Sequence, residues 1–245
     1  MRTVRRVGPV PAYVLHQAPY RDSGRILELL TQDHGRLSVF AHGVRRAKSG
    51  LVAALQPFQR LLVSWSGRGE APSLAGAELD GPPRSLPAAQ FVSACYVNEL
   101  ILKLTTRHDS HAGLFDLYDA TLAALNRGEG ERALRLFEKR LLDLVGFGLA
   151  LGVIAGGHRP IDPAAHYHFR LEHGAVEAGP GAAGRVYSGA ALLALAREQL
   201  DDDGQVRALK PLLRDAIEAC LEGRTLSTRE VAMAMRRKRS GGSKE

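Results

Sequence analysis

The hydrophobic period of the chain changes at a Pro- and Gly-rich break at residues 80–83. Before the break, short apolar runs alternate with turn residues, which is typical of β-strands. After it, apolar residues recur at the spacing of amphipathic helices. Three segments share this spacing: Ala88–Thr106, Leu114–Leu125 and Glu131–Leu151. Pro87 delays the first helix, so the sequence predicts one domain over residues 1–80 and another over residues 81–245.

Five runs in the first domain are predicted to be strands. They are rich in Val, Leu, Phe, Tyr or Trp and are separated by turn signals: Ala12–His16, Arg25–Thr31, Arg36–Ala41, Arg60–Ser66 and Leu74–Glu78. The second run could also form a turn of helix. A short helix is expected over Gly50–Leu55, between the third and fourth strands. Five strands with one small helix in that interval match the OB-fold, a compact Greek-key barrel that is widely used to bind oligonucleotides.

The second domain is predicted to be a helical bundle with an irregular insert at about residues 156–187, so the fold class is α+β. Gly, Pro and His dominate the insert, where Tyr167–Leu171 and Ala175–Ala178 favour a small hairpin. Three more helices are expected, at Ala190–Leu200, Val206–Leu221 and residues 227–239. Pro211 is expected near the first turn of the second of these. Ser227 and Glu230 would form a capping box for the last.

Positive charge is concentrated at the two ends of the chain. The formal net charge is +7, with +5 on residues 1–80, −3 on residues 81–223 and +5 on residues 224–245. A basic surface of this kind favours polyanions such as nucleic acid or anionic lipid. Because the charge is segregated and the expected barrel is an oligonucleotide-binding type, we favour DNA contact over a merely solvated surface.

Eleven basic side chains of the first domain are the candidate DNA-binding residues. They are Arg2, Arg5, Arg6, Arg21, Arg25, Arg36, Arg45, Arg46, Lys48, Arg60 and Arg68. Arginine can bind phosphate oxygens bidentately, and the release of counterions gives salt-sensitive affinity without sequence specificity. The run Arg45-Arg46-Ala47-Lys48 is the first choice for phosphate contact, because side chains on a loop can follow a nucleic-acid backbone.

Aromatic side chains of the barrel could either stack on bases or fill its core: Tyr13, Tyr20, Phe40, Phe58 and Trp65. For each of them a place in the core is favoured. Alternation puts Leu61, Val63 and Trp65 on one face of their strand but does not say which face is inside.

The last helix carries five basic residues: Arg229, Arg236, Arg237, Lys238 and Arg239. These cations could contact DNA, or could serve only the helix C-terminus and solubility.

Four histidines lie within sixteen residues, and histidine is a common zinc ligand: His158, His166, His168 and His173. Their spacing matches no standard zinc motif, and Cys95 and Cys220 are distant core-type residues, so no metal is expected. A zinc-dependent enzyme remains an alternative.

The run at residues 179–184 formally fits G-x-G-x-x-G, the pattern of a dinucleotide site. The strand and helix that such a site needs are missing around it, which favours a surface turn.

The sequence offers no starting residue for common catalysis. It contains no G-x-x-x-x-G-K-[ST], H-E-x-x-H or G-x-S-x-G pattern, so we expect a non-enzymatic protein without a cofactor. It also has no signal-type apolar segment and no uninterrupted run of about 18 apolar residues. A soluble cytoplasmic protein, associated with the nucleoid if it binds DNA, fits best.

Six motifs, in order and at suitable separations, resemble the RecO family of bacterial recombination mediators. They are Ala12–His16, Gly35-Arg36, Ala54–Phe58, Gly67–Glu70, Tyr96–Leu100 and Arg135–Glu138 leading to Leu144–Gly148. The resemblance spans nearly the whole chain. It implies binding of single- and double-stranded DNA, annealing of complementary strands, and recombinase loading with RecR on strands coated by the single-stranded-DNA-binding protein (the RecF pathway). Many family members carry a four-cysteine zinc module in the region equivalent to 156–184; this chain has no cysteine there, so the metal is not carried over.

The resemblance also implies a groove in the helical domain for the acidic, Phe-terminated tail of the single-stranded-DNA-binding protein. The candidate residues are Arg132, Arg135, Phe137, Arg140 and Leu141. An apolar slot ringed by Arg would hold the Phe by burial and the carboxylates by charge-assisted hydrogen bonds. The simpler interpretation is an amphipathic helix with a solvated basic face. For the protein as a whole, a basic OB-fold RNA-binding module is the alternative.

Overall fold

The computed structural model describes residues 6–20, 24–42, 55–67, 69, 71–157, 159–179 and 181–241, with side chains as far as residue 235 in the last helix. Leu55 lies in a turn, whereas residues 50–54 of the helix predicted at Gly50–Leu55 and His158 fall outside this range. So do seven candidate DNA-binding residues: Arg2, Arg5, Arg21, Arg45, Arg46, Lys48 and Arg68.

The chain forms two compact units. Unit 1 comprises Met1–Gly128 together with Leu226–Glu245, and unit 2 comprises Glu129–Thr225. The first two bundle helices and the last helix therefore belong with the barrel. Whether residues 1–80 fold as an independent domain, as the sequence predicts, stays a prediction.

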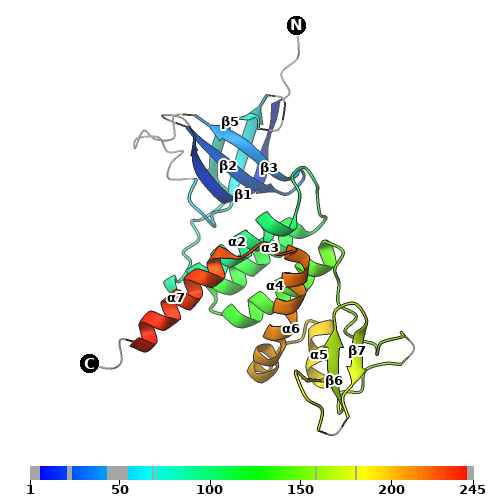
Figure 1. Cartoon of the computed structure of the whole chain (residues 1–245). Coiled ribbons are helices and arrows are strands. Elements are labelled where there is room, and N and C mark those ends of the chain that lie inside the picture. Colours follow the sequence, from blue (N-terminus) through cyan, green and yellow to red (C-terminus); the bar gives the residue numbers. More distant parts are fainter. Residues whose placement is uncertain are drawn as a thin grey trace. The chain divides into compact units, whose positions relative to one another are not determined.

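Five strands of unit 1 close into a barrel (Figure 1): β1 (Arg6–Tyr20), β2 (Gly24–Thr31), β3 (Gly35–Ala41), β4 (Leu61–Ser66) and β5 (Ser73–Leu79). Around the barrel their order is β1-β2-β3-β5-β4. The long β1 pairs antiparallel with both β2 and β4. The barrel closes where β3 and β5 pair in parallel at Phe40 and Ser73. The predicted five-stranded barrel and the α+β class are confirmed, and the second run is a strand.

The burial of β4 shows which of its faces is inside. Leu61 and Val63 are completely buried and Trp65 is 7% exposed, whereas Leu62 and Ser64 are half-buried. The inward-facing residues pack in the same core as apolar side chains of β1, β2 and β3. Burying a Val or Leu side chain stabilises the folded state by about 1.5–3 kcal/mol, so this alternation fixes the register of the strand.

Three α-helices of unit 1 lie where the apolar spacing predicts helices: α2 (Phe91–Leu104), α3 (Leu114–Asn126) and α7 (Ser227–Gly241). A short 3-10 helix, η1 (Ala88–Gln90), precedes α2. A buried side-chain amide joins α2 and α3 to the barrel. Asn98 of α2 donates from Nδ2 to the carbonyl oxygen of Leu15 in β1 at 2.9 Å, and its Oδ1 accepts from the hydroxyl of Tyr118 in α3 at 2.6 Å. Because buried polar groups are costly unless paired, this network specifies how α2 and α3 dock.

The N-terminus of α7 is held by a carboxylate of α2, and Figure 1 shows the two helices alongside each other. Glu99 accepts the backbone N–H groups of Ser227 and Thr228, at 2.8 and 2.9 Å, and the hydroxyl of Thr228 at 2.5 Å. A carboxylate here satisfies free N–H groups and interacts favourably with the helix dipole. The predicted capping box is wrong, because the N–H that Glu230 would accept is taken by Glu99.

Unit 2 combines three helices with a small sheet: α4 (Gly130–Leu144), α5 (Gly189–Ala196), α6 (Asp203–Leu221), β6 (His166–Arg170), β7 (Gly174–Glu177) and β8 (Tyr187–Ser188). The sheet order is β7-β6-β8, so the predicted hairpin forms and gains a third strand. Asp202 caps α6 by accepting the N–H of Gln205 at 3.2 Å. This cap starts α6 three residues earlier than predicted, which places Pro211 well inside the helix.

Helix α4 ends at Leu144, seven residues before the predicted end at Leu151. Gly146 adopts a φ of 85°, and the N–H of Phe147 donates to the carbonyl oxygen of Leu142 at 2.8 Å. This is a Schellman motif, in which glycine supplies the left-handed residue that ends the helix. The apolar period runs past this stop in the sequence, which explains the error. Among the residues that the structure describes, no helix has the length and apolar character to span a membrane.

Candidate nucleic-acid interface

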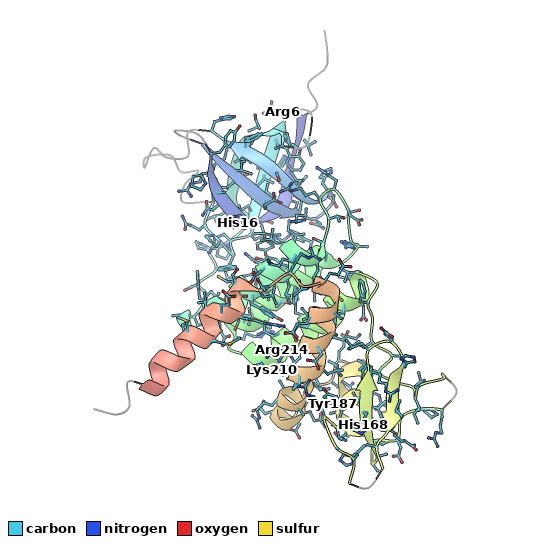
Figure 2. The ribbon with its side chains drawn as sticks, viewed as in Figure 1. Arg6, His16, His168, Tyr187, Lys210 and Arg214 are labelled. Carbon is cyan, nitrogen blue, oxygen red and sulfur yellow. The ribbon has the colours of Figure 1, made fainter. Side chains whose placement is uncertain are left out.

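The structure describes four of the eleven candidate DNA-binding residues, and two of them present charge at the barrel surface. Arg6 is exposed at the start of β1 (Figure 2), and Arg25 is half-buried near the start of β2. Arg25 donates to Gln17 Oε1 at 2.6 Å. Since Gln17 is neutral, this hydrogen bond orients the guanidinium without cancelling its charge.

The other two are engaged by acidic groups. Arg36 is 12% exposed, donates to the carbonyl oxygen of Thr105 at 2.7 Å and lies 3.7 Å from Glu28; burial lowers the pKa of its guanidinium. Arg60 donates to Asp80 at 2.6 Å, and this hydrogen bond raises the Arg60 pKa. Arg36 and Arg60 would have to give up these partners to bind phosphate.

Glu28 explains why Arg36 is held. This carboxylate lies in the otherwise apolar β2, is 8% exposed and accepts hydrogen bonds from Ser38 and Arg107. Burial would raise its pKa, but these hydrogen bonds and the charges of Arg107 and Arg36 outweigh burial and hold the Glu28 pKa below its ordinary value. Sequence analysis missed this network, although a lone Glu among leucines of a strand was a visible signal.

Gly35 has a steric reason to be glycine. Its φ is 61°, and a Cβ at this position would lie 2.3 Å from the carbonyl oxygen of Asp109, in the loop after α2. The same loop is tied to β3 by a hydrogen bond from the N–H of His108 to the carbonyl oxygen of Arg36, at 2.7 Å. The Gly35-Arg36 motif therefore fixes the barrel to the helical part of unit 1.

Tyr13 belongs to a second cluster between the barrel and α3. Its hydroxyl donates to Asp119, which also accepts from Arg84 at 2.8 Å. Burial raises the pKa of the Tyr13 hydroxyl, and the hydrogen bond to Asp119 adds to this. Burial acts against the charged form of Asp119 as well, but the hydrogen bonds from Tyr13 and Arg84 dominate and keep the Asp119 pKa low. Tyr13 is therefore a core anchor and has no face free for a base.

The five aromatic candidates divide between core and surface. Tyr13, Phe58 and Trp65 are buried, whereas Tyr20 and Phe40 are half-buried with ring centroids 4.9 Å apart. Arg25 pairs in register with Pro19, the neighbour of Tyr20. Strands 2 and 3 and the adjoining loops form the binding surface of many OB-folds. We call Tyr20, Arg25 and Phe40 the Tyr20 face.

The last helix adds to the surface of unit 1. Its described part exposes about half of each of three apolar side chains: Val231 (51%), Met233 (48%) and Met235 (53%). The side chains of Arg236–Arg239 lie outside the described range. Their charge nevertheless belongs to unit 1, because α7 packs on α2.

The five predicted groove residues all lie on α4, but on different sides of it. Phe137 and Leu141 are fully buried. Arg135 is 3% exposed and holds Glu138 with two hydrogen bonds of 2.6 Å. Only Arg132 and Arg140 are exposed, paired with Asp201 and Glu198 at 2.8 Å. These two lie at the surface in ion pairs that an acidic ligand would have to replace, whereas the other three form the core.

The histidine cluster is dispersed among the residues that the structure describes. His166 and His173 are exposed, and Nδ1 of His168 lies 3.1 Å from the carbonyl oxygen of Arg185. In this part of the chain, no group of three or more His, Cys, Asp or Glu side chains could hold a metal ion. In the glycine-rich run, a hydrogen bond of 3.1 Å from Ala182 N–H to Gly179 closes a turn.

The two units differ strongly in charge. Unit 1 contains 21 Lys and Arg against 12 Asp and Glu, a net charge of +9, whereas unit 2 contains 12 against 14, a net charge of −2. The basic C-terminal segment returns to the unit that carries the basic barrel. Both charged ends of the sequence therefore belong to one folded body.

Two family models match most of the chain. "Recombination protein O N terminal" matches residues 9–82, and "Recombination protein O C terminal" matches residues 89–230. The chain belongs to the recombination protein O family. The resemblance predicted from six motifs is thus confirmed.

Curated relatives of the recombination protein O family agree over nearly full length. DNA repair protein RecO of Methylococcus capsulatus is 43% identical over 222 residues, 90% of each chain. DNA repair protein RecO of Nitrosococcus oceani is 38% identical over 234 residues, 95% of each chain. DNA repair protein RecO of Coxiella burnetii is 36% identical over 227 residues, 93% of this chain and 98% of its own. Membership of this family supports a role in DNA repair and recombination.

Proposed function

We propose that the chain is a non-enzymatic recombination mediator that binds single- and double-stranded DNA through unit 1 and anneals complementary strands. The observation that carries this proposal is the net charge of +9 on unit 1, against −2 on unit 2. Clustered cations gain affinity for phosphates by releasing counterions, and they reduce repulsion between two strands. Annealing would then need binding energy alone and no ATP.

The phosphate contacts are assigned to the basic residues of unit 1 that are not tied to carboxylates in the structure or that lie outside the described range: Arg2, Arg5, Arg6, Arg21, Arg25, Arg45, Arg46, Lys48 and Arg68. The Tyr20 face supplies aromatic rings beside Arg25, on which bases of a single strand can stack. Arg36 and Arg60 would act indirectly, by holding the barrel. The basic end of α7 is a second surface for phosphate.

The test is annealing of complementary oligonucleotides without ATP. The chain should accelerate annealing above the spontaneous rate, and the acceleration should fall steeply with salt, because it depends on phosphate neutralisation. Annealing no faster than in protein-free controls would contradict the proposal. Structured RNA that competes as well as single-stranded DNA at matched salt would favour the RNA-binding alternative.

We further propose that the chain acts with RecR to help load recombinase on coated single strands, and that unit 2 receives the acidic tail of the coating protein. Arg132 and Arg140 are the surface cations of α4. Phe137 and Leu141 are buried and cannot line a groove, so we assign the apolar part of the groove to a cavity of unit 2. This cavity of about 560 Å³ is lined in part by Ile161, Leu193, Arg197 and Asp201, the partner of Arg132. Such a slot suits a Phe side chain beside carboxylates.

Calorimetric titration with a peptide ending in acidic residues and Phe tests the docking of the tail. The peptide should bind, and Arg132→Ala with Arg140→Ala should weaken it. Leu193→Glu should weaken it further, since it places a negative charge in the slot. A matched change on unit 1, Arg25→Ala, should have no effect. Absence of binding heat together with absence of competition would count against this site. Adding RecR and the coating protein to the annealing reaction tests whether the chain acts with RecR on coated single strands.

A further inference from the structure

A pocket of about 440 Å³ on the barrel contains the one tryptophan of the sequence. Its lining comes from β1, β3 and β4, from the β2–β3 turn, from the β4–β5 connection and from the loop after α2. The lining residues are Val7, His34, Leu37, Trp65, Gly67, Gly69, Pro72 and His108. The volume lies within the range of about 300–1,000 Å³ that is usual for small-molecule sites. None of these residues belongs to the Tyr20 face or to the Tyr13 cluster.

Three aromatic rings line the pocket, and Trp65 does so by the exposed edge of a ring that otherwise packs in the barrel core. Trp65 is 7% exposed, and the imidazole of His34 meets it edge-on, with ring centroids 5.2 Å apart and planes at 83°. His108 supplies a second imidazole. Val7, Leu37 and Pro72 add apolar contacts, and no carboxylate is among the described lining residues. A flat, uncharged aromatic ring with polar edges suits such a lining.

The rings are held by the backbone of the barrel. Trp65 pairs in register with Val7 across β1 and β4. The N–H of His34 donates to Thr31 Oγ1 at 3.1 Å, and the N–H of His108 donates to the carbonyl oxygen of Arg36 at 2.7 Å. These hydrogen bonds fix the main chain that carries the two imidazoles.

We propose that this pocket accepts one unstacked nucleobase of a bound single strand, an inference that rests on the proposed binding of DNA by unit 1. The imidazoles of His34 and His108 stack with the base beside the exposed edge of Trp65, and the imidazole nitrogens reach its polar edges. A duplex keeps its bases stacked and must first unpair one, so the pocket makes unit 1 prefer single strands.

The experiment uses the full chain and two simultaneous readouts. Anisotropy of a labelled oligonucleotide measures binding, and indole emission reports only on the pocket, because Trp65 is the sole tryptophan. A single strand should quench the emission in proportion to binding. An oligonucleotide of equal length with abasic sites should still bind through its phosphates but quench much less, and a saturating duplex should also quench less.

His34→Ala combined with His108→Ala should weaken single-strand binding about tenfold and reduce quenching, while duplex binding stays the same. The matched control is His16→Ala with His173→Ala, which removes two exposed imidazoles elsewhere; His16 lies further along β1 (Figure 2). Control binding and quenching should equal those of the unmodified chain. Circular dichroism of each variant verifies folding.

The outcomes separate this inference from the proposed function. If no oligonucleotide binds, DNA binding by unit 1 fails and the pocket inference fails with it. If single strands bind while the Trp65 emission stays unchanged, only the pocket inference is overturned. Equal quenching by normal and abasic strands, or by single strand and duplex, would also overturn it, because the pocket would then not respond to an unstacked base.

Discussion

The two units carry basic residues in similar proportion but use them differently. In unit 2, cations are matched by acidic partners, as in the pairs Arg140–Glu198, Lys210–Glu131 and Arg185–Asp215. Unit 1 contains 21 basic residues but only 12 acidic ones. An arginine-rich helix is therefore no sign of a nucleic-acid surface when its charges are cancelled within the same folded body. What matters is the net charge of that body.

The largest expected effect breaks a buried ion pair of unit 2. Arg135 and Glu138 are 3% and 2% exposed. Glu138→Ala removes the two 2.6 Å hydrogen bonds that hold the buried guanidinium of Arg135 and leaves its longer contact to Glu131 at 3.4 Å, so it should lower the free energy of unfolding by about 3 kcal/mol. Urea unfolding followed by circular dichroism should shift to lower urea. Emission of Trp65, which lies in unit 1, should report barrel unfolding at unchanged urea.

A double variant controls for the lost volume. Arg135→Met with Glu138→Leu removes both charges and should recover much of the stability. If Glu138→Ala moved the circular dichroism and Trp65 transitions by the same amount, the two units would unfold together, which would contradict the expectation that they unfold separately.

A smaller effect is expected at Glu28 in unit 1. Glu28→Gln removes the charge that Arg36 and Arg107 share and should cost about 2 kcal/mol at neutral pH. The pKa of Glu28 is lowered in the folded state, so its contribution is present above the ordinary carboxyl pKa and is lost as the pH falls through the folded value. Urea titrations of Trp65 emission should therefore show a full stability difference at about pH 7 that shrinks as the pH falls below the ordinary carboxyl pKa. A difference that stays constant over this range would contradict the assignment.

The smallest of these effects concerns the attachment of α7 to unit 1. Glu99→Gln weakens the cap on Ser227 and Thr228 and should cost about 1 kcal/mol. Hydrogen exchange of these two amides should become faster. Glu230→Gln is the matched control and should leave the exchange unchanged. Faster exchange in the Glu230 variant than in the Glu99 variant would restore the capping box that the sequence suggests.

Local signals predicted most of the fold. Alternation located all five barrel strands, and helical spacing located the helices, because burial of one face imposes these periods. The ends were less accurate. The first strand was predicted at Ala12–His16, but β1 runs from Arg6 to Tyr20 and passes through Pro9, Pro11 and Pro19, with an irregularity between Val7 and Val10.

Long-range pairs could not be predicted. Glu28 and Arg107 are 79 residues apart, Tyr13 and Asp119 are 106 apart, and Glu99 and Ser227 are 128 apart. Periodicity carries no information at such separations. For the same reason the sequence could not tell the engaged Arg36 and Arg60 from Arg25, or show that Phe137 fills the core of unit 2 instead of lining a groove.

The most direct test of the account removes equal charge from each unit and measures the salt dependence of binding to a single-stranded oligonucleotide. Replacing Arg45, Arg46 and Lys48 with alanine takes three cations from unit 1; replacing Arg132, Arg140 and Lys210 takes three from unit 2. We expect the first set to weaken binding and to lower the slope of log affinity against log salt by about 2, at about 0.7 per phosphate contact, and the second to leave the slope unchanged. Equal effects of the two sets, or none from the first, would contradict it.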